Sequence, residues 1–142
     1  MKYLMMLLVL LNFSCQSSKS VTEDPEVLVY YSKGRCLGKC PVYDLWVYQD
    51  GSFLYSGIDY VSVKGKIKSK LKKKEFNALK SMIDQGSFEK VVLNKGKDRP
   101  VTTLRVNGEE YKYYPSALSG DIKELNARMK QIVNQIVANS SP

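Results

Sequence analysis

Alternating apolar and polar positions divide the first half of the chain into short strands. The runs are rich in β-branched and aromatic residues, which favour strands, and glycine or polar residues separate them. In the fourth run, valine and isoleucine alternate with lysine, so that the lysines share one face. The pattern predicts strands over Val27–Ser32, Val42–Tyr48, Ser52–Ser56 and Val61–Ser69.

The turn at Asp50-Gly51 allows two registers between the second and third strands. A two-residue turn pairs Val47 with Leu54, whereas a three-residue turn with Gly51 in the left-handed region pairs Val47 with Phe53. We prefer the three-residue turn because it keeps the polar residues of both strands on one face. The buried face would then hold Leu45, Val47, Phe53 and Tyr55.

The second half of the chain begins with a helical period and continues with a hairpin. Apolar residues recur at helical spacing over Leu71–Ile83, and Gly86 occupies a position where helix ends favour glycine. Asn107-Gly108 is the preferred pair for a two-residue turn between strands. That turn predicts a hairpin of Thr102–Val106 with Glu109–Tyr114, with Leu104 facing Tyr111 inside and Arg105 facing Glu110 outside.

The last predicted element is a helix from about Ser119 to Ala138. Its apolar stripe consists of Leu118, Ile122, Leu125, Met129, Ile132 and Ile136. A coiled-coil partner could cover this stripe, but packing of one helix on a sheet explains so short a stripe at least as well. We therefore expect one α+β domain over residues 26–139, with an antiparallel sheet of about six strands and two helices on one face, in the order ββββαββα.

The first residues read as an export signal that ends at a cysteine. Residues 1–14 hold Lys2 followed by an apolar run too short to span a bilayer, which is typical of a signal peptide. Cys15 follows Ser14 and precedes a polar stretch, and together they resemble a bacterial lipoprotein signal in which Cys15 carries lipid. Asn12 departs from that pattern, which prefers leucine there, so ordinary cleavage nearby is the alternative.

Lipidation at Cys15 would make the membrane the first partner of the chain. Two acyl chains on the sulfur and a third on the amine exceed what stable anchoring needs, and residues 15–25 would form a flexible tether. We expect the protein in the cell envelope, anchored in the outer membrane and facing the periplasm. Surface exposure is compatible with the same anchor.

Composition narrows the range of chemistry. The chain has 22 Lys and Arg against 14 Asp and Glu, a net charge of +8, and no histidine. The lack of imidazole excludes nucleophiles activated by histidine and metal sites built on histidine. Asp44, Asp50 and Asp59 are too scattered for a carboxylate pair, and no phosphate loop or nucleophile elbow occurs. We therefore expect a binding or interaction module, not an enzyme, with no cofactor and no metal.

Two cysteines, Cys36 and Cys40, lie in the segment CLGKCPVY. In an extended strand their Cα atoms would be about 13 Å apart, beyond the reach of a disulfide, so the segment must turn for a bond to form. Gly38 can take positive φ at this turn, and Pro41 favours an extended Cys40 that leads into the next strand. Because an exported chain meets an oxidising compartment, we prefer a disulfide that closes this loop.

The alternative for Cys36 and Cys40 is a periplasmic thiol-disulfide or copper(I) site. The spacing C-x-x-x-C-P is similar to that of copper-delivery proteins of the thioredoxin fold, which bind the metal with a distant histidine. Here no histidine is present, and the residues after Pro41 favour a strand. A thioredoxin-type motif should instead open a helix whose N-terminus lowers the thiol pKa.

Several of these segments together resemble a known family. The motif C-x-G-x-C-P-x-Y in CLGKCPVY, the Asp50-Gly51 hairpin that ends at Gly57, and the segments EFNALKSMIDQGSF and DRPVTTLRVNGEEYKYY are similar to a domain of unknown function in lipoproteins of Gram-negative bacteria. The resemblance covers the chain from about Val27 to its end. It implies the lipoprotein address and the fold, and it transfers no catalytic residue.

Lysines of the fourth strand form what we call the basic strand surface, namely Lys64, Lys66, Lys68 and Lys70. Charge of this kind keeps an exposed strand soluble and protects it from edge pairing. A functional interpretation is contact with anionic lipid headgroups or lipopolysaccharide phosphates, because the tether would hold these lysines near a membrane. A protein is the other partner that we consider for this domain. Nucleic acid is a poor candidate because the compartment is wrong.

Eight tyrosines lie on or beside the predicted strands, and one interpretation is that they line a ligand groove: Tyr30, Tyr31, Tyr43, Tyr48, Tyr55, Tyr111, Tyr113 and Tyr114. Tyrosine on half-buried strands is more often part of the core, with its hydroxyl group at the rim. We therefore expect these residues to build the core.

Overall fold

Six strands and two helices make up the regular structure in a computed structural model of the protein, which describes residues 26–91, 93 and 99–140. The strands are β1 (Val27–Lys33), β2 (Val42–Tyr48), β3 (Ser52–Asp59), β4 (Gly65–Lys70), β5 (Thr102–Val106) and β6 (Glu109–Tyr113). The helices are α2 (Lys73–Gln85) and α3 (Gly120–Ser140), and a 3-10 turn, η2 (Pro115–Ala117), precedes α3. The predicted signal peptide, Cys15 and the tether lie outside the described residues.

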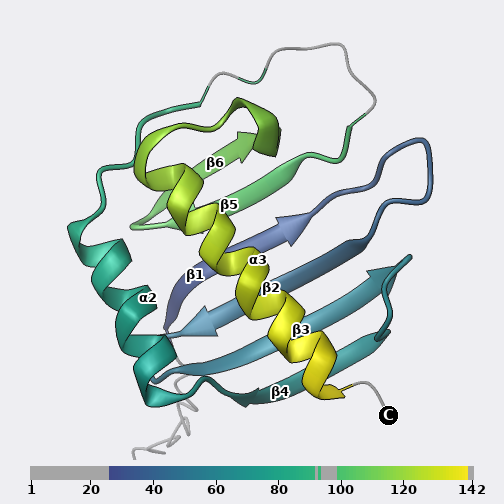
Figure 1. The fold of residues 1–142 in the computed structure, drawn as a ribbon, viewed down its shortest axis with the longest axis horizontal. Coiled ribbons are helices and arrows are strands. Elements are labelled where there is room, and N and C mark those ends of the chain that lie inside the picture. Colours follow the sequence, from purple (N-terminus) through teal and green to yellow (C-terminus); the bar gives the residue numbers. More distant parts are fainter. Residues whose placement is uncertain (1–25, 92, 94–98, 141–142) are drawn as a thin grey trace, which may run out of the picture.

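The strands form one antiparallel sheet in the order β4-β3-β2-β1-β5-β6. Figure 1 shows α3 crossing one face of this sheet, with α2 beside it on the same face. The predicted α+β class and the order ββββαββα are confirmed. The first strand lies at the centre of the sheet because β5, which comes later in the chain, pairs with its free edge.

Both predicted hairpins are confirmed. Gly51 has φ +80°, and Val47 pairs with Phe53, as the three-residue turn requires. At the second hairpin, Asn107 and Gly108 both have positive φ, of 53° and 76°. Leu104 there pairs with Tyr111 on the buried side, and Arg105 pairs with Glu110 outside.

The boundary between the third and fourth strands differs from the prediction. The third strand continues to Asp59, and β4 begins only at Gly65, where we predicted strand from Val61. A bulge in β3 places Gly57 opposite Tyr43 and Asp59 opposite Val42, and Tyr60 then turns the chain with φ 49°. Residues 60–64 therefore form a loop that packs over Gly57, and their apolar alternation does not form a strand.

The hydrophobic core lies between the helices and one face of the sheet. All six residues of the predicted apolar stripe of α3 and its approach are buried: Leu118, Ile122, Leu125, Met129, Ile132 and Ile136. The sheet thus covers the stripe that a coiled-coil partner could otherwise have covered. From α2, Leu79 and Ile83 reach the same core.

Gly86 ends α2 for a reason other than the one predicted. Its φ of −74° and ψ of 142° are extended, so the left-handed conformation does not explain the glycine. A Cβ atom at this position would lie 2.7 Å from the Met82 carbonyl oxygen and 2.6 Å from the Phe88 ring. The glycine therefore permits the close approach of the chain that follows the helix.

Candidate functional site

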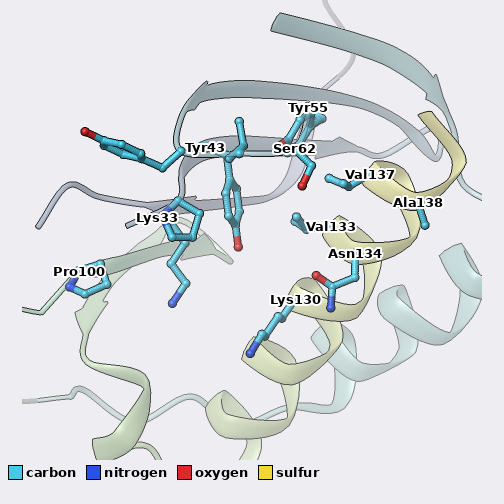
Figure 2. Close-up of a pocket in the computed structure, with 13 residues that line it drawn as sticks. Lys33, Tyr43, Tyr55, Ser62, Pro100, Lys130, Val133, Asn134, Val137 and Ala138 are labelled. Atoms are coloured by element: carbon cyan, nitrogen blue, oxygen red, sulfur yellow. The ribbon is translucent and has the colours of Figure 1, made fainter. Parts of the chain in front are cut away.

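A cavity of about 550 Å³ lies between the sheet and the second half of α3. Figure 2 shows it at the end of the sheet where β1 finishes and β2 begins. We call it the tyrosine–lysine cavity, after the side chains of Tyr43, Tyr55, Lys33 and Lys130 in its walls. Its volume falls within the range of roughly 300–1,000 Å³ that small-molecule sites in proteins occupy.

The sheet side of the cavity continues a row of buried tyrosines. Tyr31 and Tyr43 have ring centroids 6.3 Å apart, and Tyr43 and Tyr55 have centroids 5.9 Å apart. The hydroxyl groups of Tyr31 and Tyr113 both donate to Asn126 Oδ1, at 3.1 and 3.2 Å, which ties the row to α3. The expectation that tyrosines build the core is correct for five of the eight, namely Tyr31, Tyr43, Tyr55, Tyr111 and Tyr113, of which Tyr43 and Tyr55 also line the cavity. It is wrong for Tyr30, Tyr48 and Tyr114, which are only partly buried and lie outside the core.

Burial sets the ionisation of these phenols. It raises the pKa of Tyr43 to about 12, although hydrogen bonding with Tyr31 opposes the shift. Burial likewise raises the pKa of Tyr31, Tyr55 and Tyr113. At neutral pH the cavity therefore presents neutral hydroxyl groups.

Tyr55 has a hydroxyl oxygen without a hydrogen-bond partner among the described residues. The side chain is fully buried, and this oxygen would lie 3.1 Å from a Cβ atom at Gly57. Figure 2 places Tyr55 beside Ser62, where the loop after β3 meets the cavity. Buried hydroxyl groups normally find a partner, so this one is an exception, and it is buried too deeply for a molecule in the cavity to contact it without a rearrangement of its surroundings.

Two lysines give the cavity its charge. Lys33, from β1, is half-buried and its Nζ donates to Thr102 Oγ1 at 2.7 Å. Burial lowers the pKa of Lys33, and the nearby charge of Lys130 on α3 lowers it further. Within the described parts of the chain neither lysine forms a salt bridge, and the residues lining the cavity include no acid.

Neither lysine of the cavity is among the residues predicted from the sequence. For Lys33 a signal exists, because strand alternation places it on the same face as Val29 and Tyr31, which are core residues. A lysine at an inward position of a strand is unusual and marks a candidate. Lys130 carries no such signal, because it is one of the two exposed lysines of α3.

The predicted cysteine pair lies at the rim of the cavity. The structure places the sulfurs of Cys36 and Cys40 at bonding distance as a disulfide, with Cα atoms 5.9 Å apart. The turn is made without positive φ at Gly38, so that part of the prediction is wrong; instead the Gly38 N–H donates to Cys36 Sγ at 3.3 Å. Pro41 then leads directly into β2 and lines the cavity.

Removal of this disulfide should lower stability modestly. A ring of five residues restricts the unfolded chain by about 2 kcal/mol in the loop-entropy model. We expect the double substitution Cys36→Ser/Cys40→Ser to lower the free energy of unfolding by this amount in urea titrations. Reduction of the wild type should have the same effect and should not change the double variant. Equal stability of the oxidised and reduced wild type would contradict the prediction.

Ion pairs hold the loops around the rim. Asp59 at the end of β3 accepts from Arg35 at 3.1 Å and lies 3.5 Å from Lys64 Nζ. The loop of the cysteine pair is thereby connected to the loop that carries Tyr60 and Val61. Both loops contribute to the cavity wall.

Three of the four lysines of the basic strand surface face away from the cavity, and the fourth, Lys64, precedes β4 in the rim loop. Lys66, Lys68 and Lys70 pair across the strands with Ser56, Leu54 and Ser52, on the sheet face that the helices leave open. Two members have acidic neighbours, because Lys64 lies near Asp59 and Lys70 Nζ lies 3.6 Å from Asp50. The predicted lysines therefore do not contribute to the candidate site.

The described residues contain no cluster of three or more side chains that could hold a metal ion. Among the helices described, none is both long enough and apolar enough to cross a bilayer.

Comparison with known proteins places the chain in a family. No curated protein and no solved structure is significantly similar to it. A family model, the domain of unknown function DUF6438, matches residues 27–136, which include every strand, α2 and α3 as far as Ile136. All residues that line the tyrosine–lysine cavity fall within the match except Val137 and Ala138. The chain therefore belongs to the DUF6438 family.

Proposed function

We propose that the protein is an exported lipoprotein, anchored through Cys15, whose folded domain is a binding module with the tyrosine–lysine cavity as its ligand site. The signal-like residues 1–14 and the polar tether support the anchor. The outer membrane, facing the periplasm, is the location we propose. On this proposal the chain holds a ligand near a membrane and performs no covalent chemistry on it.

The composition of the cavity is the observation that most strongly supports a binding role. The cavity combines apolar walls with a few converging polar groups, which is the usual composition of a small-molecule site. Its polar groups come from β1, β3 and α3, elements that the core holds rigidly in place. A site on such elements needs little reorganisation to bind.

Filling the cavity should abolish binding of a neutral apolar probe. The test uses the unlipidated chain, by which we mean residues 15–142 with Cys15→Ala, and the fluorophore N-phenyl-1-naphthylamine. Ala138 lines the cavity near the end of α3, so a tryptophan there should occupy the space and remove most of the fluorescence increase. Ala127→Trp is the matched control, because Ala127 is exposed on the same helix and does not line the cavity. Equal fluorescence in both variants would contradict the proposal.

The competing proposal is thiol-disulfide exchange or copper(I) binding at Cys36 and Cys40. It has less support, because β2 follows Pro41 where a reactive pair would open a helix. The reduction potential separates the two. A value below about −300 mV identifies a structural bond, and a much more oxidising value would favour redox work.

A further inference from the structure

We propose that the tyrosine–lysine cavity binds an amphipathic anion, that is, a carboxylate or phosphate group carried on an apolar body. This inference rests on the proposed function of the cavity as a ligand site and specifies the class of its ligand. Two features of the structure lead to it, namely an uncompensated pair of cations and an apolar wall.

The first feature is the pair of lysines. Figure 2 shows the side chains of Lys33 and Lys130 extending on the same side as the Tyr43 hydroxyl group. Burial lowers the pKa of Lys33, the charge of Lys130 lowers it further, and no salt bridge among the described residues relieves this repulsion. An anion between the two ammonium groups would remove this repulsion and gain charge-assisted hydrogen bonds.

The second feature is the apolar wall of the cavity. Val133, Val137 and Ala138 from α3 line it together with Val61 and Pro41 from the rim loops. A small inorganic anion could use the lysines but would leave this wall exposed to water. An apolar body attached to the anion would bury it, which favours an amphipathic ligand over a free ion.

The test measures binding of three probes to the unlipidated chain by calorimetry: hexyl phosphate, hexanol and inorganic phosphate. We expect hexyl phosphate to bind most tightly, because it alone satisfies both the charge and the apolar wall. Binding of hexyl phosphate should weaken as salt increases, whereas that of hexanol should not. Hexanol binding as tightly as hexyl phosphate would overturn the anion inference and leave the proposed function intact. If neither these probes nor the neutral fluorophore binds, the proposed function itself fails.

Substitutions on one helix test the charge directly. Lys130→Met should raise the dissociation constant of hexyl phosphate about tenfold, as expected for a hydrogen bond to a charged group, and should leave hexanol unaffected. Lys123→Met is the matched control, because Lys123 is an exposed lysine of α3 that does not line the cavity. Unchanged affinity of Lys130→Met for hexyl phosphate would overturn the inference.

Tyr55→Phe is a control in the sheet beneath the cavity. Its hydroxyl group is fully buried and has no partner among the described residues, so its loss should raise the melting temperature of the free protein and leave the affinity for hexyl phosphate unchanged.

A long-chain lysophosphatidic acid is a further probe that identifies the source of the ligand. If it competes with hexyl phosphate, the ligand is a membrane lipid. If it does not bind because its chain is too long for the cavity, the ligand is a small solute. Both results support the inference.

Discussion

Replacement of Gly57 with alanine is expected to lower the free energy of unfolding by about 3 kcal/mol or more, among the largest effects of a single methyl group. A Cβ atom there would overlap the carbonyl oxygen of Val63 and would lie 3.0 Å from a Val61 methyl carbon. The overlapping oxygen belongs to the backbone, so a change of rotamer cannot relieve it. The loop over residues 60–64 would have to move away from the sheet.

Gly38→Ala is the matched control for this prediction. Gly38 lies in the loop of the cysteine pair, and a Cβ atom there would meet only Cys36 Sγ, at 3.9 Å, an ordinary contact. Urea titrations of the unlipidated chain should show a large decrease in midpoint for Gly57→Ala and little change for Gly38→Ala. Because the displaced loop carries Val61 and Ser62, Gly57→Ala should also weaken probe binding. Wild-type stability of Gly57→Ala would show that the loop does not pack on β3 as the structure describes.

The exported chain without Cys15 is expected to leave the membrane almost completely. In this variant an ordinary cleavable signal peptide replaces residues 1–15, so that the exported chain begins at Gln16. Three acyl chains on the wild type should hold it in the membrane fraction through salt washing, because two lipid signals already suffice for stable anchoring. Fractionation of cells, followed by detection of the protein in the pellet and the supernatant, measures the difference.

In the same experiment, the salt concentration distinguishes membrane attachment through the lipid anchor from attachment through the basic strand surface. If the chain that begins at Gln16 stays in the pellet at low salt and leaves at high salt, the lysines of the strand surface contribute to attachment. Variants with glutamine at Lys66 and Lys68 should then lose that residual binding, since neither residue has an acidic partner among the described residues. Full retention of the Gln16 chain at high salt would refute lipid anchoring as the main attachment.

The parts of the fold that the sequence predicts correctly are those determined by near neighbours. The register of both hairpins follows from the turn residues Gly51 and Asn107-Gly108, because only a few residues tolerate positive φ. The stripe of α3 follows from spacing along one helix. These local rules fix the face that each side chain occupies, and the order of the elements then leaves few ways to cover the sheet.

The boundary of β4 could not be predicted in the same way. Val61 and Val63 continue the alternation of the strand, and a loop that buries one apolar side chain produces the same pattern. The deciding interaction is the packing of the Val63 carbonyl group over Gly57. Sequence alternation contains no information on that contact, which depends on the bulge in β3.

The candidate site was predictable only in fragments. Tyr43 and Tyr55 were named as possible groove residues, and the register gives their shared face. Lys130 reaches the cavity only because α3 crosses the sheet at a particular angle, which spacing along the chain does not determine (Figure 1). The site is thus assembled by tertiary packing from elements that are far apart in the sequence.

The basic strand surface and the cavity occupy opposite sides of the same sheet, and this separation gives the domain a direction. Lysines of β4 point from the open face, whereas Lys33 of β1 and Lys130 of α3 line the cavity on the covered face. If the open face rests on an anionic membrane, the cavity is held on the side remote from the lipid headgroups. A tethered domain in that orientation could capture a ligand from the aqueous space while its other face remains on the membrane, so that neither contact would compete with the other.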